Sequence, residues 1–123
     1  MDKVNFKGIN ITEEQRQFTK VIDGDSFTVK VSNSNERAII ALAISQAIGG
    51  QPITSVDPTE YENIKRVVTL CNVVVKGPDW WTNAADCPSS QLITELWRFS
   101  LESNEEFDSR LRELVKTKAL GKK

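Results

Sequence analysis

Histidine is absent from the 123 residues of this chain. It is the side chain most used for proton transfer near neutral pH and the commonest metal ligand. Its absence does not exclude paired carboxylates or a nucleophilic lysine. The Asp and Glu residues, however, stand at expected helix starts and on polar faces, where capping and solvation account for them. The sequence therefore predicts a protein that binds other molecules, is not an enzyme and uses no cofactor.

Cysteine is scarce, with two residues in the chain. Cys71 stands among valines and is expected to be a small buried hydrophobe, whereas Cys87 lies in a polar loop before Pro88. Two isolated thiols without histidine do not make a structural zinc site, so no metal is expected. In a reducing compartment we expect no disulfide between them.

Long apolar runs and an excess of one charge are also missing. The longest apolar stretch, residues 38–44, is too short to cross a bilayer, and residues 1–5 lack the basic start of a signal peptide. We therefore expect a cytosolic protein with no membrane partner. The formal net charge is −1, and the basic residues form no stripe with interleaved aromatics, so no nucleic-acid partner is expected.

The composition is that of a globular protein, with 39% hydrophobic and 27% charged residues. The length suits one domain, residues 1–123. The expected fold is α+β: an N-terminal β-hairpin or small antiparallel sheet, followed by a bundle of about four helices. The β element covers about residues 1–31, the helical part residues 35–118, and residues 119–123 form a frayed tail.

The β element contains one clear turn signal. Residues 18–22 and 26–31 flank Asp23-Gly24-Asp25, and an Asp-Gly pair between such runs favours a tight hairpin. In the second run Phe27, Val29 and Val31 are expected to share the buried face. Residues 4–11 suit an edge strand, with Gly8 marking a bulge.

The first two expected helices have clear boundaries. Residues 36–48 follow several candidate N-caps and end at Gly-Gly; this helix is apolar almost all round, so it is expected to be the covered, central element. Asp57-Pro58 opens the second helix, which Gly77-Pro78 ends. The run of valines at 73–75 fits either the last helical turn or a strand.

The C-terminal third predicts two helices. One begins near Ser89 or Ser90, with an inward row comprising Leu92, Ile93, Leu96, Trp97 and Leu101. The sequence Ser103-Asn104-Glu105-Glu106 resembles a new N-cap and predicts that a separate helix starts there.

The candidate partner-binding residues are aromatic or aliphatic: Trp80, Trp81, Trp97, Phe107, Leu111 and Leu114. Tryptophans beside a proline turn are good anchors for a partner, but one or both could instead close the core. Because adjacent loop residues rarely point the same way, we expect one indole inward and one at the surface. The apolar face of the last helix either packs on the body or docks into a partner, and the hairpin edge could pair with another copy.

The order of these segments, from about Phe27 to Phe107, resembles the tail-assembly chaperones of long-tailed (siphovirus-like) bacteriophages. The most distinctive part is the run from Val75 to Trp81, and the other matching segments are the Gly-Gly after the first helix, Asp57-Pro58, residues 92–97 and residues 105–107. The resemblance implies a mainly helical fold with a small β element.

The same resemblance implies a function. Such chaperones bind the aggregation-prone tape-measure protein, keep it soluble and help to recruit the tail-tube protein. They act in the host cytoplasm, are absent from the mature virion and are commonly also made in a longer, frameshifted form. The alternatives are a small structural phage protein (tail terminator, head–tail joining or decoration protein) or a small inhibitor that binds a host protein.

Overall fold

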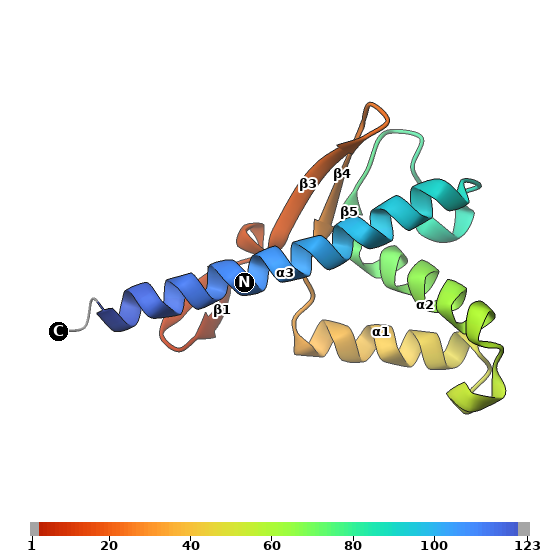
Figure 1. The fold of residues 1–123 in the computed structure, drawn as a ribbon, viewed down its shortest axis with the longest axis horizontal. Helices are drawn as coiled ribbons and strands as arrows, with labels where there is room; N and C mark the ends of the chain where they lie inside the picture. The colour runs from red at the N-terminus through yellow and green to blue at the C-terminus, as the bar shows by residue number, and fades with distance from the viewer. Residues whose placement is uncertain (1–2, 121–123) are drawn as a thin grey trace.

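The computed structural model describes residues 3–120, which fold into two small antiparallel sheets and three α-helices (Figure 1). The β1–β2 hairpin pairs only with itself, and the second sheet has the strand order β3-β4-β5. The expected α+β class is therefore correct, but the described chain has three helices where about four were expected. In chain order the elements are β1 (Lys3–Phe6), β2 (Ile9–Thr12), β3 (Gln17–Ile22), β4 (Asp25–Lys30), α1 (Ser34–Ala47), α2 (Pro58–Val73), β5 (Val74–Lys76) and α3 (Ser90–Leu120).

The first hairpin differs from the sequence prediction. Lys7 and Gly8 have φ values of 53° and 81° and form the two-residue turn between β1 and β2. Positive φ at both positions is the geometry of a type I′ turn, whose twist matches that of the strands. Gly8 is thus a turn residue and not a bulge, and residues 3–12 form a hairpin of their own and not an edge strand.

The second hairpin was predicted correctly. Asp23 and Gly24 have φ values of 51° and 85°, and β3 pairs with β4 from Gln17–Lys30 to Ile22–Asp25. Phe27, Val29 and Val31 are buried, as the alternation indicates. β5 adds a third strand beside β4, so the valine run divides: Val73 ends α2 and Val74 begins the strand.

α1 begins and ends where expected, but it is not the central helix. Asn33 and Glu36 form a reciprocal capping box, and the helix stops before Gly49-Gly50. α1 lies at the margin of the molecule with α2 along one side (Figure 1). Ile40 is buried there, whereas Ile39 and Leu42 are 53% and 60% exposed. An apolar helix is therefore only half covered in this chain.

α2 starts with the predicted cap, because the Asp57 carboxylate accepts hydrogen bonds from the amides of Thr59 and Glu60, both at 3.1 Å. Its inward face carries Leu70 and Val73, which are buried. Cys71 lies between them in sequence and points away from the core. The expectation of a buried thiol at this position is wrong, because the spacing of the helix turns Cys71 outward.

α3 is one continuous helix of 31 residues, so the predicted break at residues 103–106 is wrong. Ser103 is buried in mid-helix instead of capping a new one. Leu96, Ser103 and Phe107 recur at helical spacing on one face, and this unbroken face keeps the helix going past a local cap signal. Leu101, expected to point inward, lies off this face and is exposed. Of the expected frayed tail at residues 119–123, Ala119 and Leu120 belong to α3, and residues 121–123 lie outside the described part.

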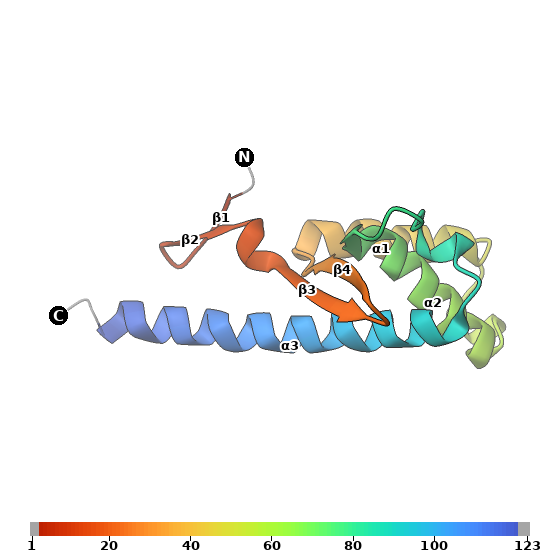
Figure 2. The ribbon, with the colours of Figure 1, turned by 90° about the horizontal axis from the view of Figure 1, so that it is seen from above.

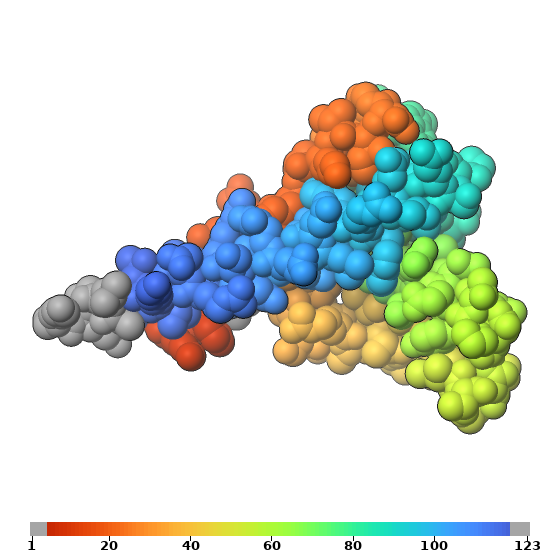
Figure 3. Space-filling view, in the orientation of Figure 1, coloured from red at the N-terminus to blue at the C-terminus, as the bar shows by residue number. Residues whose placement is uncertain are grey.

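The core lies at one end of α3, where the helix crosses α2 and the β3–β5 sheet (Figure 2). Phe27, Leu70 and Leu96 are its most buried large side chains, and Trp81 and Trp97 pack against it. The other end of α3, residues 107–120, is here called the α3 arm. In the space-filling view it tapers away from the broad body (Figure 3).

A partly buried ion-pair cluster joins the sheet to the start of α1. Arg16, 6% exposed, donates to the Val31 carbonyl and to Glu36 Oε1, both at 2.8 Å. Lys30 Nζ lies 2.6 Å from Glu36 Oε2. Burial alone would raise the pKa of Glu36, but hydrogen bonds from Lys30, the Asn33 amide and Arg16 outweigh it and lower the pKa to about 2. The Glu36 carboxylate therefore pairs with two cations of the β element, Arg16 and Lys30, and connects them to the first turn of α1.

Candidate binding surfaces

The Trp80-Trp81 loop joins β5 to α3 and divides its two indoles as expected. The Trp81 amide donates to the Pro78 carbonyl at 2.9 Å, and the tight turn directs the Trp81 ring onto Phe27, with centroids 5.3 Å apart in edge-to-face geometry. Trp81 is half-buried and belongs to the core margin. Trp80 is 55% exposed, and its ring centroid lies farther from that of Phe27, at 6.2 Å. Trp80 is therefore the indole that a partner can reach.

The α3 arm carries the predicted row of Phe107, Leu111 and Leu114. Phe107 and Leu111 are half-buried, and Leu114 is 40% exposed. The β1–β2 hairpin lies beside this part of the helix, held in part by Lys118 Nζ, which donates to the Gly8 carbonyl at 3.1 Å (Figure 2). Where the start of β3 passes the arm, Arg110 lies over the Phe18 ring at 4.8 Å.

Between hairpin and arm an open groove of about 440 Å³ remains. Its apolar floor is formed by Phe6, Leu111 and Val115. Lys7, Asp108, Arg112 and Lys116 surround this floor with charges of both signs. An apolar strip with a rim of mixed charges is typical of surfaces that bind another polypeptide, because the charged rim remains hydrated when the partner is absent.

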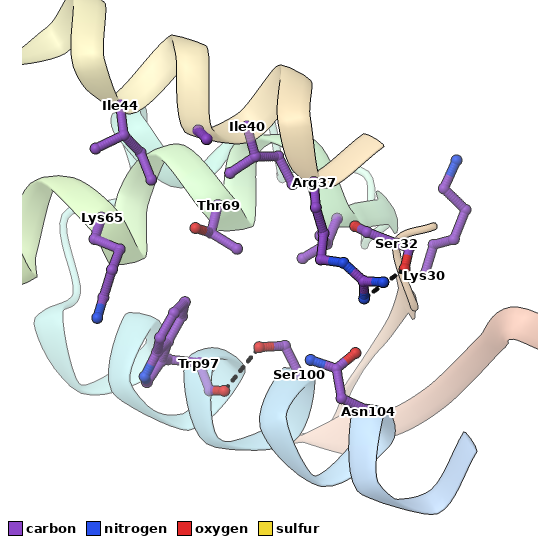
Figure 4. Close-up of a pocket in the computed structure, with 12 residues that line it drawn as sticks. Lys30, Ser32, Arg37, Ile40, Ile44, Lys65, Thr69, Trp97, Ser100 and Asn104 are labelled. Carbon is purple, nitrogen blue, oxygen red and sulfur yellow. Dashed lines mark hydrogen bonds between the residues drawn. The ribbon is translucent and has the colours of Figure 1, made fainter. Parts of the chain in front are cut away.

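A third surface is a cleft of about 320 Å³ enclosed by α1, α2 and α3, with Trp97 on its α3 side (Figure 4). Trp97 is half-buried and packs on the core, and the charged ends of Lys65 and Arg66 lie 5.9 and 6.0 Å from its ring centroid. The structure therefore separates the six candidate residues onto three surfaces: the loop, the arm and the cleft. It does not bring the three tryptophans together.

No family model, curated protein or solved structure matches this chain. What the surfaces can do must therefore be argued from their own chemistry.

Within residues 3–120, no group of three or more Cys, Asp and Glu residues is placed to hold a metal ion. None of the helices described has the length and apolar character needed to cross a membrane. What the described residues offer is an exposed indole, an apolar groove along a projecting helix, and a cleft that combines cationic groups with an apolar wall.

The cleft is the part of the site that sequence reasoning missed, apart from Trp97. Its cationic lining comes from β4, α1 and α2, at Lys30, Arg37 and Lys65, which no local motif connects. The relevant signal would have been the pairing of α1 with α2, since that pairing sets which residues face α3. An apolar pattern that runs all round α1 does not reveal this orientation.

Proposed function

We propose that this chain is a tail-assembly chaperone of a long-tailed bacteriophage, which binds the tape-measure protein through the groove of the α3 arm. Binding would keep this client soluble in the host cytoplasm during assembly and leave the chaperone out of the mature virion. The alternative classes, a structural virion protein or a host-directed inhibitor, have no specific feature of the described residues in their favour.

One observation carries the proposal: an apolar helical face continues for about three turns past the body and is only partly covered. Leu111 and Val115 line the groove, whereas Leu114 lines a second surface hollow, with Gln15 and Thr117, on the other flank of the arm. A client helix could lay its own apolar stripe along this row, because residues at spacings of three and four form matching ridges and grooves. The family resemblance implies a tape-measure protein that is long and helical, and such a client offers many apolar stripes.

The surroundings of the groove suit a chaperone that must release its client. Lys7, Asp108 and Arg112 stand at the rim, and charged rims contribute more to association rate and selectivity than to affinity. The apolar floor is small compared with the roughly 800 Å² per partner of a stable interface. An interface of this small size is better suited to several copies that each bind weakly along one long client than to a single tight complex. Trp80, on a separate surface, would remain available for the tail-tube protein.

The test is co-expression with the tape-measure protein encoded in the same phage genome. We expect the soluble fraction of the client to rise with the wild-type chain and to return towards the client-alone level with Leu111→Asp, because a buried carboxylate would disrupt the groove floor. Ser109→Asp is the matched control. It introduces the same charge on the opposite side of the same helix and should leave the client soluble.

Two outcomes would contradict the proposal. One is a client whose solubility does not depend on the chain. The other is recovery of the chain in stoichiometric amounts from purified virions, which would favour a structural component. Circular dichroism of both variants separates loss of binding from loss of folding, since the arm projects from the body and its variants should melt near the wild type.

A further inference from the structure

We propose that the cleft between α1, α2 and α3 is a binding site for a small amphipathic anion, a ligand with a planar apolar body and a carboxylate or similar acidic group. The proposal rests on the charges, the apolar wall and the size of the cleft. It does not depend on the proposed chaperone function, because the cleft and the α3 arm are separate surfaces.

The charged residues that line the cleft are all cationic. Lys30, Arg37 and Lys65 come from three different elements, and no Asp or Glu is among the lining residues. Lys30 is neutralised by Glu36 at 2.6 Å and Lys65 by Glu62 at 2.7 Å. Two of the three cations thus have a carboxylate partner outside the cleft.

Arg37 is the exception. Within the described residues its guanidinium forms no salt bridge, and its hydrogen bond goes to the Ser32 carbonyl at 3.1 Å. A guanidinium has five N–H donors in a planar fork that fits a carboxylate or sulfonate with two parallel bonds. Figure 4 shows the Arg37 side chain extending from α1 into the space between α1 and α3, with its guanidinium turned towards Ser32. The anionic group of a ligand would lie here.

The rest of the lining supplies an apolar wall. Ile40 and Ile44 face the cleft from α1, and Trp97 faces it from α3 (Figure 4). Lys65 Nζ, paired with Glu62, lies 5.9 Å from the centroid of the Trp97 ring at this end. A flat apolar body between the two isoleucines and the indole would place its acidic group near Arg37.

The size of the cleft favours a small molecule. About 320 Å³ lies at the lower end of the range for small-ligand pockets, roughly 300–1,000 Å³. An α-helix, about 10 Å across with its side chains, does not fit between elements this close. The polar groups of Thr69, Ser100 and Asn104 along the lining would set the orientation of the ligand, as a few placed polar groups do in such pockets.

The experiment titrates the full chain with two fluorescent probes that share an aromatic body, 8-anilinonaphthalene-1-sulfonate and the uncharged N-phenyl-1-naphthylamine. We expect saturable 1:1 binding of the sulfonate and at least fivefold weaker binding of the neutral probe. Arg37→Gln should weaken sulfonate binding by about tenfold, the range of one charge-assisted hydrogen-bonded contact. Arg98→Gln, an exposed arginine of α3 outside the cleft, should leave it unchanged.

The location of the probe is read from the indole N–H signals in a ¹⁵N–¹H correlation spectrum. The Trp97 signal should shift on titration, while the Trp80 signal should stay in place. Equal affinity for the two probes, insensitivity to Arg37→Gln or a shift confined to Trp80 would each overturn the proposal. Binding of an acidic peptide without any binding of the sulfonate would also overturn it and assign the cleft to a protein partner.

Discussion

Along one face of α3, residues 93–103 pack into the core, whereas residues 107–118 on the same face lie against a two-stranded hairpin and solvent. Leu96 is 0% exposed and Leu114 is 40% exposed, although both are leucines on the same helical stripe. The periodicity of a helix shows which face is apolar, but the rest of the fold decides what covers it. The half-covered part is where a partner can still bury apolar surface.

The largest effect should appear when the two leucines of this comparison are truncated one at a time, and it should come from Leu96. Leu96→Ala should lower the free energy of unfolding by about 2–5 kcal/mol, because it removes buried methyl groups and leaves a cavity. Leu114→Ala should cost less than about 1 kcal/mol, since its side chain already meets water. Urea denaturation followed by circular dichroism measures both. Equal losses would mean that the arm is covered as well as the body, and the client groove would lose its basis.

The next effect is a pH dependence of the free energy of unfolding that arises in the body, at Glu36, and not in the arm. Glu36 has a folded-state pKa of about 2 against a reference value of 4.5. A lowered folded pKa means that the carboxylate stabilises the fold above about pH 4.5, and this contribution is lost as the pH falls towards 2. It amounts to at most about 3 kcal/mol, because one pKa unit corresponds to about 1.4 kcal/mol and the side chain is partly hydrated.

The measurement is the free energy of unfolding between pH 2 and 7 for the wild type and Glu36→Gln. The variant should be less stable at pH 7, where Arg16 is left buried without its carboxylate, and its stability should vary less between pH 4.5 and 2. Glu102→Gln, at an exposed position of α3 that forms no salt bridge within the described residues, is the control. A pH profile that Glu36→Gln leaves unchanged would remove the cluster as the link between sheet and α1.

The body was also the part that sequence reasoning described best. The Asp23-Gly24 turn, the Asp57-Pro58 start of α2 and the start of α3 at Ser90 are local signals, since each depends on backbone geometry within a few residues. Two of the wrong predictions, the break in α3 at residues 103–106 and the central position of α1, depend on tertiary packing. Whether Ser103 caps a new helix or is buried within a longer one is decided by the tertiary contacts of α3, and those with β3 and β4 join residues far apart in sequence.

The same reasoning explains what was predictable in the candidate surfaces. The division of Trp80 and Trp81 follows from a tight turn between adjacent residues, so it could be expected without knowing which indole is inside. The groove depends on the relative position of β1 and α3, and the cleft on that of β4, α1, α2 and α3. Their residues, such as Phe6 with Leu111 or Arg37 with Trp97, are separated by 60 or more positions, and no local pattern relates them.

The smallest effect comes from glycine-to-alanine substitutions in the turns of the two hairpins, one in the body and one beside the arm. Gly24 and Gly8 occupy equivalent turn positions, with φ values of 85° and 81°, so alanine at either position is strained by about 1 kcal/mol. Gly24→Ala should lower the global free energy of unfolding by this amount, because β3 and β4 carry the core residues Ile22 and Phe27.

Gly8→Ala should instead act locally. An added Cβ would meet only the flexible end of Lys118, at 3.0 Å, so the strain is confined to the turn and to that one contact. We expect hydrogen exchange of the β1–β2 amides to accelerate by about fivefold, the factor for 1 kcal/mol, while core amides exchange as in the wild type. If Gly8→Ala accelerates exchange in the core as much as Gly24→Ala does, the hairpin unfolds together with the body. The arm would then be a cooperative part of the fold, and a client could enter its groove only by displacing a hairpin as stable as the core.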